Sequence, residues 1–180
     1  MNDKVFQGSA NLAAIESMIA ALAHENGFER QDARESLVEI GEPAVAPLIK
    51  ALADPSEDLR WQAARTLSKI GSPAAGPALV KALEDEDFGV RWLAAQGLIG
   101  LKREGLVPLL EALERRPDSA WLREGAQHVL RTLVEEGRDA EVKPVLAALE
   151  GVEPALELPW AARTALDRLA PSRKVLSTSE

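Results

Sequence analysis

A short pattern recurs at nearly constant spacing along this chain, and this recurrence constrains the fold more than any other feature of the sequence. The pattern is an arginine followed by alanine three residues later and by leucine seven residues later. It begins at Arg30, Arg60, Arg91 and Arg123, and it returns at Pro159 without the arginine. Successive starts lie 30, 31, 32 and 36 residues apart. Repeats of this length predict a solenoid, in which similar two-helix units stack side by side.

Two further markers keep the same register. Prolines precede the pattern at Pro47, Pro77, Pro108 and Pro144. Ala-Leu pairs begin at Ala21, Ala51, Ala82, Ala112 and Ala148. The three markers together indicate five units, numbered here from the N-terminus, which cover the chain from about residue 12 to residue 170.

Each unit is expected to consist of two helices. In unit two, the first helix should span about 44–53 and the second should end near Ile70. Ser56 or Asp58 can cap the start of the second helix, and Gly71 can end it. The connections are short, which makes consecutive helices antiparallel. The expected fold is therefore all-α, a right-handed α-α superhelix (a solenoid) of about five helical hairpins.

The repeat also sets the expected domain boundaries. Residues 11–170 should form a single repeat domain, preceded by a flexible lead at 1–10 and followed by a flexible tail at 171–180. The first and last units depart most from the pattern, which is typical of the capping units of a solenoid.

Composition excludes several classes of site and partner. The chain has no cysteine, which rules out disulfides and thiolate chemistry. Its net charge of −8 opposes binding to nucleic-acid phosphates, and no apolar run is long enough to span a membrane. We therefore expect a cytoplasmic protein with neither a nucleic-acid partner nor a membrane partner.

Helical phase separates a core face from a free face on each second helix. We call the arginine that begins each repeat pattern the frame arginine and number it position zero. Positions −1, +3, +7 and +10 then fall on one side of the helix, and positions +1, +5 and +8 point away from that side. The core positions hold Leu59, Ala63, Leu67 and Ile70 in unit two, and Val90, Ala94, Leu98 and Leu101 in unit three. The frame arginine lies at the margin of this face, where its guanidinium can meet a carboxylate such as Asp54 or Asp85.

The residues around the frame arginine resemble a known repeat family. The pattern is carried by Leu52, Asp54, Leu59, Arg60, Trp61, Ala63 and Ala64, and again by Leu83, Asp85, Val90, Arg91, Trp92, Ala94 and Ala95. It is similar to the short class of HEAT repeats, which is found in phycobilin-lyase-like proteins and in small bacterial scaffolds. The resemblance implies a helical solenoid, whereas solenoids of this type have many functions.

In a HEAT-type stack the second helices line the concave surface, so positions +1, +5 and +8 become the candidate binding surface. The candidate partner-binding residues there are Trp61, Arg65, Trp92, Gln96, His128, Arg131 and Trp160. Tryptophan and arginine are frequent hot spots of protein interfaces. Alternatively, each indole lies flat against the next repeat and only closes the surface. Trp121, at position −2, is expected to pack locally.

The sequence offers no recognisable constellation for catalysis. Its two histidines, His24 and His128, lie far apart along the chain, so no metal site is predicted. Neither a phosphate-binding glycine loop nor a nucleophile motif is found. We therefore expect a non-enzyme without cofactors.

Three functions remain possible on this basis. The leading hypothesis is a non-catalytic scaffold that binds a protein or peptide partner through the concave face of the repeat array. The resemblance implies an alternative, a phycobilin-lyase-like role or another way of handling a small molecule. The third possibility is a purely structural or self-associating module.

Overall fold

The computed structural model describes the backbone of residues 3–137 and 140–169, and the side chains of residues 12–137 and 141–169. All regular elements in these ranges are helical. They are α1 (Asp3–Ala21), α2 (Gly27–Ile40), α3 (Glu42–Ala51), α4 (Glu57–Ile70), η1 (Pro73–Ala75), α5 (Gly76–Ala82), α6 (Phe88–Leu101), α7 (Arg103–Arg115), α8 (Ala120–Glu135), η2 (Ala140–Val142), α9 (Lys143–Glu150) and α10 (Pro154–Leu169). None of these helices is both long enough and apolar enough to cross a membrane.

In unit two, the second helix begins and ends at the expected signals, whereas the first helix, α3, begins and ends two residues earlier than expected. The Oγ atom of Ser56 accepts a hydrogen bond from the backbone N–H of Leu59 and caps α4. Gly71 ends the helix with φ of 67°, a left-handed conformation that glycine adopts without a steric cost. The second helices of units one, three and four begin in the same way, with side-chain caps from Asn26, Asp87 and Ser119.

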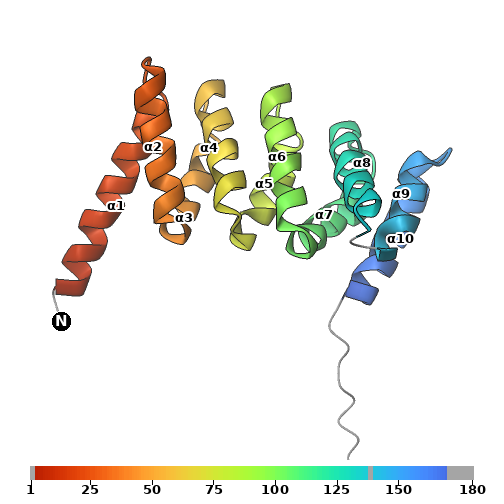
Figure 1. The fold of residues 1–180 in the computed structure, drawn as a ribbon. Helices are drawn as coiled ribbons and strands as arrows, with labels where there is room; N and C mark the ends of the chain where they lie inside the picture. Colours follow the sequence, from red (N-terminus) through yellow and green to blue (C-terminus); the bar gives the residue numbers. More distant parts are fainter. Residues whose placement is uncertain (1–2, 138–139, 170–180) are drawn as a thin grey trace, which may run out of the picture.

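The helices form two rows (Figure 1). The second helices α2, α4, α6 and α8 lie side by side, each packed on the next, and the first helices form a row behind them. We call the outward surface of α2, α4, α6 and α8 the second-helix face. The core between the rows contains most of the predicted residues, with Ala63, Ala94 and Leu98 fully buried and Leu67 only 1% exposed. Leu59 and Ile70 are only partly buried and pack against this core.

The last hairpin departs from the two rows. Its second helix, α10, packs against α7 and α9, whereas α9 packs against α8. The ion pairs follow the same arrangement, because Arg163 on α10 meets Glu114 on α7 at 3.4 Å and Arg131 on α8 meets Glu150 on α9 at 2.6 Å. The hairpin therefore crosses the end of the stack instead of extending both rows.

This arrangement corrects one expectation about the candidate surface. Trp160 lies on α10, beside the row of first helices, so it does not continue the line of Trp61 and Trp92. The physical reason is the longer connection into unit five, where the spacing rises to 36 residues and a hairpin of different orientation can form.

The N-terminal helix begins earlier than the expected start of the repeat domain. Helix α1 begins at Asp3, inside the segment 1–10 that was expected to precede the repeat domain as a lead. The expected tail, residues 171–180, lies outside the described residues.

Two glycines allow a matched test of this packing. A Cβ atom added at Gly105 would lie 2.6 Å from the backbone carbonyl oxygen of Leu98, whereas one added at Gly100 would meet nothing within 4 Å. We expect Gly105→Ala to destabilise the protein by about 1–3 kcal/mol through overpacking. Gly100→Ala should instead stabilise it by about 0.4–1 kcal/mol, because alanine restricts the unfolded chain. Urea unfolding measures both, and equal effects of the two substitutions would contradict the packing of α6 against α7.

Candidate partner-binding surface

The first pair of candidate residues, Trp61 and Arg65, lies on α4. The Arg65 guanidinium carbon is 5.1 Å from the centre of the Trp61 ring, which is a cation–π contact one helical turn apart. The indole also reaches the next unit, because a Cβ atom at Gly89 would lie 2.9 Å from its Cδ1 and Nε1 atoms. Trp61 is partly buried, so much of its surface closes the gap between α4 and α6.

Three other candidates come together across α6 and α8. The rings of Trp92 and His128 stack with their centres 4.8 Å apart and their planes 26° apart. The side-chain amide nitrogen of Gln96 lies 3.2 Å from Nε2 of His128. The sequence placed Gln96 and His128 at the same position, +5, of neighbouring units and Trp92 at position +1, and the structure shows that the three residues form one cluster.

Next to this cluster is a cavity of about 240 Å³, which we call the aromatic hollow. It is lined by Leu83, Phe88, Arg91, Trp92, Ala95, Trp121, Glu124, Gly125 and His128. The three large aromatic side chains around it remain partly open to solvent, with exposed fractions of 63% for Phe88, 47% for Trp92 and 45% for Trp121. The hollow is therefore an apolar surface that the fold leaves uncovered.

Small residues give the hollow its depth. Ala95 on α6 and Gly125 on α8 line the hollow together with the large aromatic side chains. A Cβ atom at Gly125 would lie 2.8 Å from a methyl carbon of Leu83, so the α8 backbone rests directly on that buried leucine. This close approach needs a residue without a side chain.

A guanidinium forms part of the wall of the hollow. The Cζ atom of Arg91 lies 5.0 Å from the centre of the Trp121 ring and 5.7 Å from the centre of the Phe88 ring. At these distances both rings attract the cation, which holds Arg91 at the edge of the hollow. Phe88, Arg91 and Trp121 were not among the candidate residues. Their positions, −3, zero and −2, lie in the first turn of a second helix, where the sequence suggested local packing or a structural role.

The frame arginines share a contact with the backbone that the sequence did not predict. Each donates from Nη1 to backbone carbonyls of the turn that precedes its own helix, five or six residues earlier. The acceptors are His24 and Glu25 for Arg30, Asp54 and Pro55 for Arg60, Asp85 and Glu86 for Arg91, and Pro117 for Arg123. These bonds fix the turn between the two helices in each of the first four units.

Arg60 makes a second set of contacts with the next unit. Its Nε and Nη2 atoms donate to the two carboxylate oxygens of Asp85 at 2.8 and 3.0 Å, and Nη2 also lies 3.2 Å from Glu86. The side chains of Arg60 and Asp85 are only 8% and 10% exposed. The hydrogen bonds that Arg60 donates to Asp85 raise the pKa of Arg60 further above its usual value, so this guanidinium stays charged.

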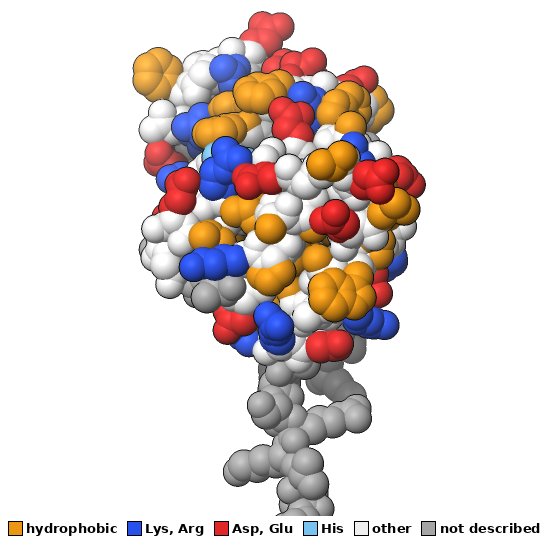
Figure 2. Space-filling model, turned by 90° about the vertical axis from the view of Figure 1, so that its right-hand side faces the viewer, with side chains coloured by type: hydrophobic (Ala, Val, Ile, Leu, Met, Phe, Trp, Pro, Cys, Tyr) orange, Lys and Arg blue, Asp and Glu red, His pale blue; other side chains and the backbone are white. Residues whose placement is uncertain are grey.

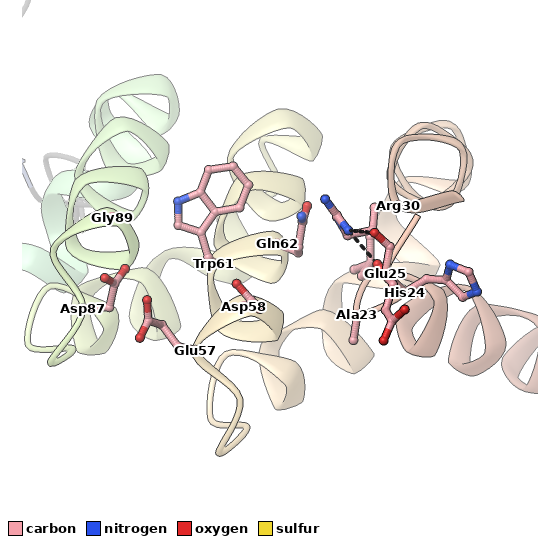
Figure 3. A pocket seen from close by; sticks show the side chains of 11 residues that line it. Ala23, His24, Glu25, Arg30, Glu57, Asp58, Trp61, Gln62, Asp87 and Gly89 are labelled. Atoms are coloured by element: carbon pink, nitrogen blue, oxygen red, sulfur yellow. Dashed lines mark hydrogen bonds between the residues drawn. The ribbon is translucent and has the colours of Figure 1, made fainter. Parts of the chain in front are cut away.

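A second cavity, of about 560 Å³, opens near the starts of α2, α4 and α6 (Figure 3). Trp61 projects above the carboxylates of Glu57, Asp58 and Asp87, and Gln62 lies between it and Arg30 (Figure 3). These three acids stabilise the starts of helices, because Asp87 caps α6 and the other two lie in the first turn of α4. The cavity therefore gives no separate argument for a ligand.

The two remaining candidates lie toward the C-terminal end. Arg131 is paired with Glu150, and its hydrogen bond lowers the pKa of that carboxyl group. Trp160 is 74% exposed on α10, near exposed Leu156. Figure 2 looks onto this end and shows apolar side chains separated by acidic and basic ones, so they do not form one continuous apolar patch.

Comparison with known proteins identifies the repeats. A family model described as HEAT repeats matches residues 15–98 and 45–131. A chain in the structure of the complex of CpcE and CpcF of phycocyanin lyase, from Nostoc, is 28% identical, with a TM-score of 0.55, covering 83% of this chain and 98% of that chain. A designed armadillo-repeat protein is 22% identical, with a TM-score of 0.38, covering 85% of this chain and 98% of that chain. No curated protein matches.

Proposed function

Because the chain belongs to the HEAT-repeat family, in the short class that resembles phycobilin lyases, we propose that it is a non-catalytic scaffold that binds a segment of a partner protein. The binding surface is the second-helix face, and the aromatic hollow is its anchor point. The observation that carries this proposal is the open aromatic lining of the hollow, in which Phe88, Trp92 and Trp121 are each about half exposed or more.

The size of the hollow favours a side chain over a whole small molecule. Sites for drug-sized ligands usually have volumes of about 300–1,000 Å³ and enclose most of the ligand. The hollow, at about 240 Å³, is smaller and lies on an open helix face. Interfaces between proteins commonly concentrate their binding energy where one large side chain enters a pocket of this kind.

A small-molecule role is the second candidate, and one observation favours it. The similar Nostoc chain comes from a phycocyanin lyase complex, and both Trp92 and His128 line the hollow. Quenching of tryptophan fluorescence by an added bilin at micromolar concentration would favour this role. The same titration without quenching would leave the protein partner as the better explanation.

The scaffold proposal predicts that Trp92 is a binding hot spot. Peptides selected from a random-sequence library displayed on phage serve as the probe. We expect Trp92→Ala to weaken binding of the selected peptides by at least about 2 kcal/mol, or roughly thirtyfold, because the substitution removes one wall of the hollow. Isothermal titration calorimetry measures the loss.

Trp160→Ala is the matched control, because it removes the same exposed side chain from α10, away from the hollow. It should leave the affinity unchanged, and circular dichroism should show intact helices in both variants. The proposal fails if no peptide is recovered, or if both tryptophan variants bind the selected peptides as well as the wild type.

A further inference from the structure

We infer that the aromatic hollow is built to receive an acidic side chain of the partner, an Asp or Glu next to a large apolar residue, and that Arg91 binds its carboxylate. This inference rests on the proposed function and specifies the chemistry of the segment that binds. It follows from a comparison of two units that fold alike but use their frame arginine differently.

In unit two, the Nε, Nη1 and Nη2 atoms of the frame arginine all donate hydrogen bonds to groups of the protein itself. The Nη1 atom of Arg60 binds its own turn, and its Nε and Nη2 edge binds the carboxylate of Asp85 in the next turn. Such two-point pairing is the geometry in which a guanidinium binds a carboxylate most strongly. Unit two therefore shows how this position of the fold binds an acid.

In unit three, half of this arrangement is missing. Nη1 of Arg91 binds the carbonyls of Asp85 and Glu86, as in unit two. The residue equivalent to Asp85 in the next turn is Pro117, which has no carboxylate. Among the residues that the structure describes, no carboxylate pairs with Arg91.

The turns of units three and four are held together by other residues. Glu84 accepts hydrogen bonds from Arg116 and from the hydroxyl of Ser119, so this junction does not need Arg91. The guanidinium of Arg91 instead lies against Phe88 and Trp121, at the edge of the open hollow. Its Nε and Nη2 edge is thus available to an acceptor from outside.

The charged side chains around the hollow favour a partner segment that carries a single carboxylate. Of the three acids that precede α6, Asp85 and Glu86 are paired with Arg60, and Asp87 accepts the backbone N–H of Val90 as the cap of the helix. Glu124 also lines the hollow, and it selects against segments that carry several acids in a row. The aromatic walls provide a place for an apolar side chain beside the acid, which is why we infer an acidic residue with a large apolar neighbour.

The test uses the peptides selected on the wild-type protein by phage display. We expect them to be enriched in Asp or Glu next to a large apolar residue. We also expect Arg91→Gln to weaken their binding by roughly ten- to hundredfold, the usual effect of losing a hydrogen bond between charged groups. Replacing the peptide's Glu by Gln should weaken binding to the wild type by a similar factor and should cause little further loss in Arg91→Gln.

Arg123→Gln is the matched control, because Arg123 makes the same contact with its own turn but does not line the hollow. It should bind the peptides like the wild type. The inference is overturned if the selected peptides show no acidic preference, or if Glu and Gln peptides bind the wild type equally. If those peptides still lose affinity in Trp92→Ala, the proposed function stands and only the inference fails. The peptide substitution is measured on the wild type, so it remains decisive even if Arg91→Gln does not fold.

Discussion

Replacing Leu98 by alanine is expected to reduce the free energy of unfolding by about 2–5 kcal/mol, the usual cost of removing a buried leucine side chain. Leu98 is fully buried on α6, where it faces the core between the two rows of helices. Each unit contacts mainly its neighbours, so a cavity at this position weakens the stack on both sides. Urea unfolding followed by circular dichroism measures the effect.

Leu156→Ala is the control, because Leu156 is 73% exposed on α10. It should change the free energy of unfolding by no more than about 0.5 kcal/mol. A loss below about 1 kcal/mol for Leu98→Ala would contradict the helical phase that places the frame leucines in the core.

The second large effect is expected at the ion pair between units two and three. Asp85→Ala should destabilise the protein by about 3 kcal/mol, because it leaves the buried guanidinium of Arg60 without its carboxylate. This is the lower end of the usual range for such a loss, since Nη1 of Arg60 keeps its bonds to the carbonyls of Asp54 and Pro55. Thermal and urea unfolding both report the change.

Glu86→Gln provides the comparison at the same guanidinium. The side chain of Glu86 is 83% exposed, and solvent screens its attraction to Arg60. Its substitution should therefore cost less than about 1 kcal/mol. Equal losses at Asp85 and Glu86 would show that burial does not determine the strength of this contact.

The periodicity of the sequence was sufficient to predict the helical hairpins and their core. A period near 30 residues, with alanine and leucine at fixed positions, has few physical solutions besides stacked hairpins, and Leu67 and Leu98 are buried as predicted. The helix caps were also predictable, because Ser56 and Gly71 act through local backbone geometry that depends on few neighbours.

The last hairpin could not be predicted in the same way. Aligning Pro159 with the frame arginines placed Trp160 in line with Trp61 and Trp92, whereas α10 lies against α7. An alignment of repeats gives the phase of each helix but not the angle at which a hairpin meets the stack. That angle depends on the connection between α8 and α9, which is longer than in the other units.

The aromatic hollow was predicted only in part. Trp92 and His128 were candidates, because their phase points them away from the core. Phe88 and Trp121 were missed, since they lie in the first turns of their helices, where phase alone does not show what they face. One signal in the sequence bears on the role inferred for Arg91, because the position held by Asp54 in unit two and by Asp85 in unit three is Pro117 in unit four.

The most direct test of the binding surface is the NMR spectrum of the four tryptophan indole N–H groups, recorded while a selected peptide is added. Single-tryptophan substitutions assign the signals. Because Trp92 and Trp121 line the hollow and Trp160 lies on α10, we expect the first two signals to shift and the signal of Trp160 to stay in place. Unchanged signals from Trp92 and Trp121 in a spectrum in which Trp160 shifts would contradict binding at the second-helix face.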